Sequence, residues 1–166
     1  MTSINDPPPP DLGLVDGLAQ LSFLVHNALV EIAGQHDLSI IQTRLLGVLR
    51  DREPTMNELG RLLGLDKSSI SGLIDRAQRR DLVTRTVSTI DRRAFQVSIT
   101  DAGRRLAAEV AARFTERIEA AVAPLPDTDR QLLARLATRI VTADADRRGV
   151  DLRTAERSSR ASLLGP

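Results

Sequence analysis

The side chains best suited to bind a negatively charged partner lie close together near residue 92. Arg92 and Arg93 directly follow Asp91, so two guanidinium groups stand beside one carboxylate. A guanidinium group donates several hydrogen bonds in a fixed fork that matches the oxygens of a phosphate. The spacing therefore predicts a basic tip that contacts a negatively charged molecule.

The residues on either side of this tip predict the hairpin that presents it. Phe95, Val97 and Ile99 alternate with polar residues, and a period of two is typical of a half-buried strand. Residues 82–88 are rich in β-branched side chains and form the predicted partner strand. Thr100 offers a side-chain oxygen that can cap the start of a following helix. We therefore expect a two-stranded wing set between helices, because so small a hairpin cannot form a large core sheet.

Two short helices with capping signals precede the wing. Thr55 and Glu58 have the spacing of a capping box, and Gly64 can end the first helix in the left-handed conformation. Asp66 is a good N-cap for the second helix, which is predicted over residues 66–80. The apolar face of that second helix holds Ile70, Leu73, Ile74 and Ala77. Two short helices joined by a Gly-Leu-Asp turn predict a helix-turn-helix.

The polar face of the second helix carries residues that suit a DNA groove. Its first turn holds Lys67, Ser68 and Ser69, and a helix N-terminus attracts phosphate. Gly72 costs ~1 kcal/mol of helix propensity relative to alanine, and a close approach of DNA would explain its presence. Any exposed amphipathic helix has a polar face. The interpretation therefore depends on the order of the elements, which is capped helix, turn, polar-faced helix and basic hairpin.

The composition limits the class of protein. The chain has 166 residues, of which 42% are hydrophobic and 2% aromatic, and it contains no cysteine. The lack of cysteine excludes disulfides and cysteine–zinc sites, and the scarcity of aromatic residues argues against a stacking platform for single-stranded nucleic acid. The N-terminus lacks the pattern of a signal peptide, and no uninterrupted apolar run reaches the ~20 residues of a membrane span. We therefore expect a cytoplasmic chain with no membrane partner.

Basic residues are concentrated in the middle of the chain. Residues 61–105 contain ten basic and five acidic residues, whereas the whole chain has a net charge of +1. A basic segment between more acidic flanks suits a polyanionic partner. An arginine-rich solvated surface would give the same pattern, so charge alone does not decide between the two.

Long amphipathic helices flank the central segment. Apolar residues at steps of three and four predict helices over 14–34, 103–122 and 127–148, with a shorter one over 38–49. The three long apolar stripes are too extensive for a small winged domain to cover, which predicts burial against a second chain. The predicted organisation is a proline-rich arm (1–11), a helical dimerisation region (12–36 and 103–148), a winged helix-turn-helix DNA-binding domain (37–102) and a mobile tail (149–166).

Residues 66–103 resemble the winged helix-turn-helix of the MarR family, the multiple-antibiotic-resistance regulators of bacteria. The strongest part of the resemblance is the tip that begins at Asp91, spaced before Thr100 and Gly103. The order and length of the flanking helices also fit, so the resemblance extends over roughly residues 12–147. It implies a mainly α fold, in which a winged helix-turn-helix with a two-stranded β wing is joined to long N- and C-terminal dimerisation helices.

The resemblance also implies which residues contact DNA. In this family the equivalent of helix 66–80 enters the major groove and the wing lies over the adjacent minor groove, where narrow grooves favour arginine. Arg92 and Arg93 would then contact the minor groove, while Asp91 and Arg85 would position the wing. The other implied DNA contacts are Thr55, Asn57, Lys67, Ser68, Ser69, Gly72, Arg76 and Arg79.

Two residues depart from the usual pattern of the family. Asp81 stands where a glycine usually precedes the first wing strand. Aspartate tolerates left-handed backbone angles better than most residues, so we expect the turn to form. Gly72 stands where a larger, often basic residue is common, and this difference would change the base preference.

The function implied by the resemblance is a sequence-specific DNA-binding transcriptional regulator, in the form of a homodimeric repressor on a pseudo-palindromic operator. Many relatives release double-stranded DNA when a small, often aromatic or anionic, ligand binds, and Phe23, His26 and Arg44 are the candidate ligand contacts. A constitutive DNA-binding protein without an effector, and a winged helix that binds protein, remain as alternatives. We expect no enzyme activity, cofactor or metal site, because the two histidines stand ten residues apart and lack the partners that zinc needs.

Overall fold

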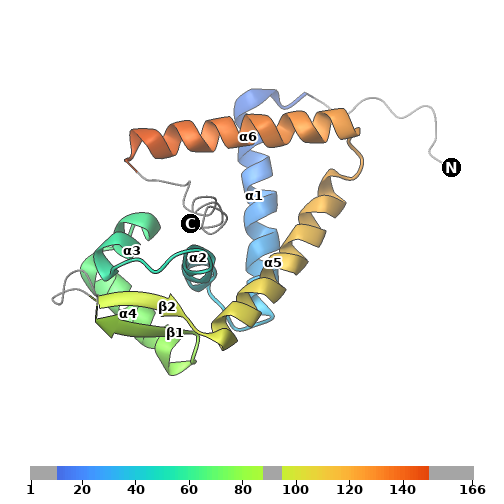
Figure 1. Cartoon of the computed structure of the whole chain (residues 1–166). Coiled ribbons are helices and arrows are strands. Elements are labelled where there is room, and N and C mark those ends of the chain that lie inside the picture. Colours follow the sequence, from blue (N-terminus) through green and yellow to red (C-terminus); the bar gives the residue numbers. More distant parts are fainter. Residues whose placement is uncertain (1–10, 88–94, 150–166) are drawn as a thin grey trace, which may run out of the picture.

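The computed structural model describes residues 11–87 and 95–149, so nearly all of the predicted arm and tail lies outside the described residues. Within these ranges it contains six helices and one two-stranded antiparallel sheet, which confirms the predicted mainly α fold with a β wing (Figure 1). The helix bounds lie within two residues of the predicted ones. In chain order the elements are α1 (Gly13–Gly34), α2 (Ile40–Leu49), α3 (Met56–Leu63), α4 (Lys67–Arg79), β1 (Val83–Val87), β2 (Phe95–Ile99), α5 (Asp101–Val122) and α6 (Asp127–Arg147).

The helix-turn-helix formed by α3 and α4 begins and ends where the local signals predict. The backbone N–H of Glu58 donates to Thr55 Oγ1 at 3.3 Å, and the backbone N–H of Thr55 donates to Glu58 Oε2 at 2.7 Å. Gly64 ends α3 with a φ of 68°, and Asp66 caps α4. Asp81 precedes β1 with a φ of 55°, so the predicted left-handed turn forms without glycine. These caps and turns are confirmed.

The wing pairs its two strands in a simple antiparallel register. Val83 lies opposite Ile99 at one end of the ladder, and Val87 lies opposite Phe95 at the other. Val97 and Ile99 are buried, as the alternation predicts. Phe95 lies on the same face of β2 as these two residues but is 52% exposed, and its cross-strand neighbour Val87 is 54% exposed. A period of two identifies the face of a strand, but it does not show how far the core extends beneath that strand.

The backbone of Leu82 joins three elements. Its N–H donates to the carbonyl oxygen of Ala77 near the end of α4, and its carbonyl oxygen accepts from the N–H of Thr100 at the start of α5. Gly103 on α5 packs directly against the same carbonyl group. A Cβ at position 103 would collide with the Leu82 oxygen and would lie 2.9 Å from Ile99 Cγ1. The meeting point of α4, β1 and α5 therefore requires glycine at position 103.

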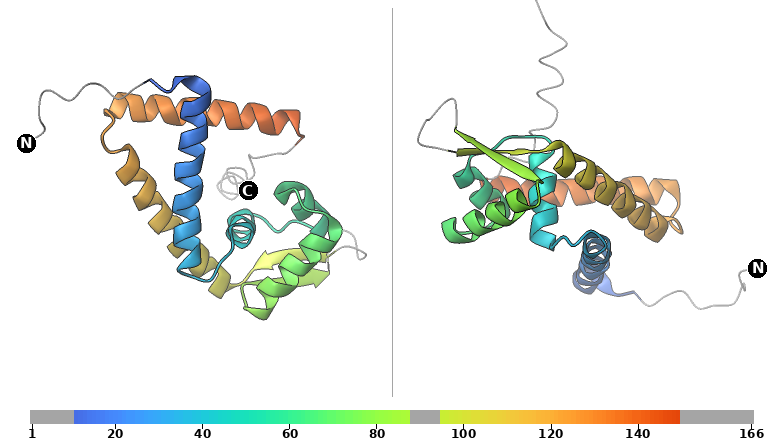
Figure 2. Two further views of the ribbon diagram at one scale, coloured as in Figure 1. Left: turned by 180° about the vertical axis from the view of Figure 1, so that it is seen from behind. Right: turned by 90° about the horizontal axis from the view of Figure 1, so that it is seen from below.

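The long helices form an open frame beside the compact winged part. Figure 1 shows α1, α5 and α6 as three sides of this frame, and the view from behind in Figure 2 shows the same arrangement. Helices α2 to α4 and the sheet pack together next to the corner where α1 meets α5. In the described part of α6 only Ala145 is buried. The core of this chain therefore lies in the winged part and at its junction with α1 and α5.

Helix α1 is long and apolar enough to cross a membrane when it is judged by length and composition alone. This property is not visible as an uninterrupted apolar run in the sequence, because polar residues interrupt the helix. One such helix is weak evidence for a membrane span, since helices of soluble proteins pass the same test. Only 6% of its most apolar window is buried by the described part of the chain, so most of its apolar surface is exposed there.

We predict that Gly103→Ala lowers the free energy of unfolding by about 1–3 kcal/mol, because the added methyl group must displace backbone. Gly47→Ala on α2 is the matched control, since a Cβ at position 47 meets no atom within 4 Å. This control should raise the free energy of unfolding by up to about 1 kcal/mol through helix propensity. Urea denaturation at a fixed protein concentration measures both changes. A Gly103→Ala protein as stable as the wild type would contradict the packing described above.

Candidate nucleic-acid interface

Helix α4 presents a stripe of polar and basic side chains on the molecular surface. Its apolar face is buried in the core, where the four predicted core residues have exposed fractions of 0–2%. The opposite face is therefore directed outward. Six of the predicted DNA contacts lie on the accessible surface of α4, namely Lys67, Ser68, Ser69, Gly72, Arg76 and Arg79.

The start of α3 places two further predicted contacts in different situations. Asn57 is exposed on the first turn of α3. Thr55 is half-buried, and its hydroxyl donates to Glu58 Oε2 at 2.8 Å. Its backbone also forms a bridge to Gln96 on β2. Thr55 thus anchors α3 to the wing. The side chain of Asn57 makes no comparable hydrogen bond to another element among the described residues.

A hollow of about 310 Å³ lies along the middle of α4. It is lined by Ile41, Leu65, Ser68, Ser69, Gly72, Leu73 and Arg76. A Cβ at position 72 would lie 3.3 Å from Nη1 of Arg76, so the guanidinium group lies over the glycine. Gly72 therefore gives Arg76 room to fold along the helix. Sequence reasoning explained Gly72 by a close approach of DNA, and it did not identify this intramolecular reason.

Carboxylates occupy the beginnings of both helices of the motif. The backbone N–H of Thr55, and then its hydroxyl, lower the pKa of Glu58 below its ordinary value. The hydroxyl of Ser68, followed by the N–H and hydroxyl of Ser69, lowers the pKa of Asp66 well below its ordinary range. Both groups are therefore ionised at neutral pH. The N-terminus of α4 is already bonded to a carboxylate, so the free N–H groups that would attract phosphate are fewer than the sequence suggests.

Arg85 joins the wing to α4. Its Nη2 forms an ion pair with Asp75 and donates to the carbonyl oxygen of Ser71 at 3.2 Å. The side chain of Arg85 is 25% exposed, so this contact is partly shielded from water. Arg85 thus fixes β1 relative to α4. Sequence reasoning did not identify Asp75 as its partner, although a carboxylate on the polar face of a DNA-facing helix is a signal that calls for a basic partner.

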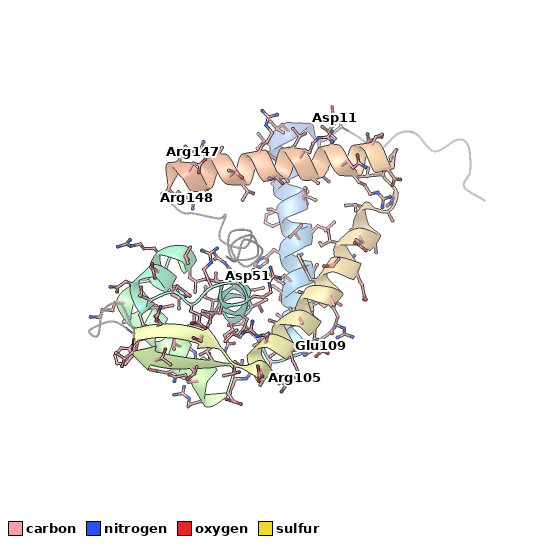
Figure 3. The ribbon with its side chains drawn as sticks, viewed as in Figure 1. Asp11, Asp51, Arg105, Glu109, Arg147 and Arg148 are labelled. Carbon is pink, nitrogen blue, oxygen red and sulfur yellow. The ribbon has the colours of Figure 1, made fainter. Side chains whose placement is uncertain are left out.

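Arg80 joins the end of α4 to the turn that follows α1. Its guanidinium group donates to the carbonyl oxygens of Asp37 at 2.6 Å and His36 at 3.0 Å. Nε2 of His36 lies 3.8 Å from Oε1 of Glu109 on α5 (Figure 3). Helix α4 is therefore connected to both α1 and α5 through this turn. Sequence reasoning missed the contact because backbone acceptors more than forty residues away leave no local pattern.

The tip of the wing lies outside the described residues. The contacts predicted for Asp91, Arg92 and Arg93 therefore stay predictions. The described ends of β1 at Val87 and β2 at Phe95 lie on the same side of the molecule as α4 (Figure 1).

The three candidate ligand contacts lie apart from an apolar cavity that the fold creates. Phe23, His26 and Arg44 are exposed on α1 and α2. A cavity of about 150 Å³ lies instead between α1, α2 and α5. Its lining consists of Leu29, Leu38, Thr43, Leu46, Gly47, Arg50, Ala107, Val110, Ala111 and Phe114. None of these residues was predicted to contact a ligand, because a cavity between three helices depends on their packing rather than on a local motif.

Solved structures share this arrangement of elements. An X-ray structure of a MarR family transcriptional regulator from Rhodococcus sp. RHA1 has 26% identity and a TM-score of 0.63, and the match covers 75% of this chain and 89% of that one. NadR in complex with 4-hydroxyphenylacetate has 21% identity and a TM-score of 0.64, with 80% and 96% covered. A mutant of MepR from S. aureus, bound to an oligodeoxyribonucleotide, has 20% identity and a TM-score of 0.57, with 76% and 94% covered.

The segment that holds the helix-turn-helix carries the match to a known family. No curated protein matches the chain. A model described as MarR family matches residues 36–94, which include α2 to β1. Over residues 36–94, the winged part of the chain matches the MarR family. This match, together with the similarity to the Rhodococcus regulator, supports a DNA-binding transcriptional regulator.

Proposed function

We propose that this protein is a homodimeric repressor of the MarR family that binds a pseudo-palindromic operator through α4, its recognition helix, and leaves it when a small aromatic or anionic ligand binds. The observation that carries the proposal is the open polar stripe of α4, held beside a wing with a basic tip. A helix of this kind fits the major groove, and an arginine-bearing wing fits the adjacent minor groove. The oligonucleotide bound by the MepR mutant supports this interpretation of the shared fold.

The proposed contacts divide into groove and positioning roles. Arg76, with the serines of the first turn, faces base edges, whereas Lys67 and Arg79 neutralise phosphates. Arg92 and Arg93 enter the minor groove. Asp91 and Arg85 hold the wing, and the ion pair of Arg85 with Asp75 supports that part of the assignment. Asn57, and Thr55 through its place at the start of α3, lie next to the DNA backbone.

The exposed apolar surface of the long helices supports a homodimer. On α6, Leu136 is 43% exposed and Ile140 is 57% exposed. On α1, Leu14 is 77% exposed and Phe23 is 59% exposed. Monomeric soluble proteins rarely leave contiguous apolar surface of this kind in water. A second copy of the chain covers both helices and places two recognition helices on one face of the duplex.

The cavity between α1, α2 and α5 supports the ligand. This largely apolar cavity of about 150 Å³ can hold a molecule the size of benzene. Arg50 lines this cavity and is paired with Asp51, with 3.1 Å between Nη2 and Oδ2. It can exchange this partner for an anionic ligand. NadR carries 4-hydroxyphenylacetate, a small aromatic acid. Because the walls of the cavity come from the long helices α1 and α5 and from α2 of the winged part, a ligand there would change how the two parts pack together.

We predict that Arg92→Ala combined with Arg93→Ala weakens binding to duplex DNA by about tenfold or more, because charge-assisted hydrogen bonds are lost. The slope of log K against log salt should also fall by about 1 to 2, since each lost phosphate contact contributes about 0.9. Fluorescence anisotropy over a series of salt concentrations measures both effects.

The matched control for the wing is Arg147→Ala combined with Arg148→Ala, which removes the same charge from the end of α6 (Figure 3). This control should change the slope much less. If the wing variant binds duplex DNA as tightly as the wild type, the wing assignment is wrong. If the wild type shows no salt-dependent duplex binding at all, the alternative of a protein-binding winged helix is favoured.

We predict that Leu136→Asp combined with Ile140→Asp converts the protein to monomers, because buried carboxylates would be unpaired in the dimer interface. The two positions lie four residues apart on one face of α6. Thr138→Asp, on the opposite side of the helix, is the control and should remain a dimer. Sedimentation equilibrium should give about twice 18.1 kDa for the wild type and 18.1 kDa for the double variant. A wild type that is monomeric at every concentration would contradict the homodimer.

We predict that 4-hydroxyphenylacetate, used as a probe, raises the melting temperature of the wild type and releases it from duplex DNA. Ala111→Leu fills the cavity and should abolish both effects while DNA binding persists. Ala112→Leu adds the same side chain at an exposed neighbouring position and should respond like the wild type. If neither this probe nor a panel of small aromatic acids changes melting or DNA binding, the ligand is refuted and the constitutive DNA-binding protein holds.

A further inference from the structure

The N-cap residue of α4, Asp66, accepts hydrogen bonds from the hydroxyl groups of two serines. Ser68 Oγ donates to Asp66 Oδ1 at 2.6 Å, and Ser69 Oγ donates to Asp66 Oδ2 at 2.8 Å. The backbone N–H of Ser69 donates to Asp66 Oδ1 at 2.8 Å. One carboxylate therefore receives three hydrogen bonds at the point where α4 begins.

This arrangement fixes the hydrogen-bonding character of the two serines. A serine hydroxyl has one proton to donate and two lone pairs to accept with. When the proton is donated to Asp66, only the lone pairs are left for another partner. A bond to a carboxylate is roughly twice as strong as one between neutral groups, so a neutral base edge does not readily compete for the proton. The lowered pKa of Asp66 keeps the carboxylate ionised at neutral pH.

The two serines stand where the recognition helix meets a base edge. Both are exposed, and both line the hollow along the middle of α4 together with Gly72 and Arg76. Their neighbours Lys67 and Arg76 can only donate. The surface of α4 therefore offers acceptors at positions 68 and 69 and donors at positions 67 and 76. In the major groove, adenine N6 and cytosine N4 are donors, whereas guanine and thymine present acceptors at the corresponding edges.

We propose that Asp66 is a positioning residue for base selection, because it makes the Ser68 and Ser69 hydroxyls accept hydrogen bonds from the amino groups of adenine or cytosine. This inference rests on the proposed docking of α4 in the major groove. In this arrangement Lys67 binds a phosphate and Arg76 binds guanine. Phosphate oxygens cannot be partners of the two serines, because a phosphate oxygen can only accept a hydrogen bond. Asp66 itself does not contact a base.

The substitution Asp66→Asn tests the proposal with little change of shape, since asparagine is as good an N-cap as aspartate. Its carbonyl oxygen must keep the bond from the N–H of Ser69. The amide nitrogen then takes the place of Oδ2 and donates to Ser69 Oγ, so the proton of that hydroxyl becomes free to donate outward. Asp66→Asn should therefore convert Ser69 from an acceptor to a donor while Ser68 stays an acceptor.

The measurement is the base preference of the full-length protein, obtained by selection from a randomised duplex library and by binding to single-base variants of the selected site. Ser69→Ala identifies the base pair that faces Ser69, since preference is lost there alone. At that pair the wild type should favour adenine or cytosine by about 3- to 10-fold. Asp66→Asn should favour guanine or thymine by a similar factor, and Asp66→Asn combined with Ser69→Ala should show no preference.

The base preferences of the wild type and of the variants decide whether Asp66 sets the hydrogen-bonding direction of Ser69. An Asp66→Asn protein that binds duplex DNA with an unchanged preference overturns the role of Asp66 and leaves the DNA-binding function intact. If that variant does not fold, the wild type and Ser69→Ala still give the answer: a Ser69-dependent preference for guanine or thymine overturns the proposal, and one for adenine or cytosine supports it. A wild type that binds no duplex refutes both the proposed docking and this inference.

Discussion

Burial of one face of α4 determines which of its side chains face outward. Full burial of a large apolar side chain stabilises a protein by about 1.5–3 kcal/mol, whereas an exposed ion pair contributes about 0–1 kcal/mol. The orientation of α4 is therefore set by its core face and not by its surface contacts. The side chains that fix it are Ile70, Leu73, Ile74 and Ala77, all of which are almost completely buried. The polar stripe is exposed as a consequence of this packing.

Three contacts extend that constraint to the rest of the molecule. The backbone of Leu82 connects the end of α4 to α5, Arg85 connects α4 to β1, and Arg80 connects α4 to the turn after α1. Helix α4 is thus held on three sides by elements that also border the apolar cavity or form the wing. A change in the position of α1 or α5 would be transmitted to α4 through Arg80 and Leu82, which is the physical basis for ligand control in the proposed function.

Local chemistry made much of this fold predictable, and long-range packing explains the rest. The caps at Thr55 and Asp66 and the turn at Asp81 depend on residues within four positions, so the sequence predicts them correctly. The exposure of Phe95 was not predictable, because the extent of the core beneath a strand is a tertiary property. The partner of Arg85 and the acceptors of Arg80 come from other elements, and the lining of the cavity comes from three helices. For the same reason the stripe on α4 was predictable, whereas the hydrogen bonds that orient its serines were not.

In the proposed function, two copies of α4 bind one face of the same duplex. The most direct test is a hydroxyl-radical footprint of the full-length protein on the DNA that flanks its own gene. The account predicts two protected segments with related sequences, whose centres lie about 10–10.5 base pairs, or about 34 Å, apart. A single protected segment, or protection without any related pair of sequences, would contradict it.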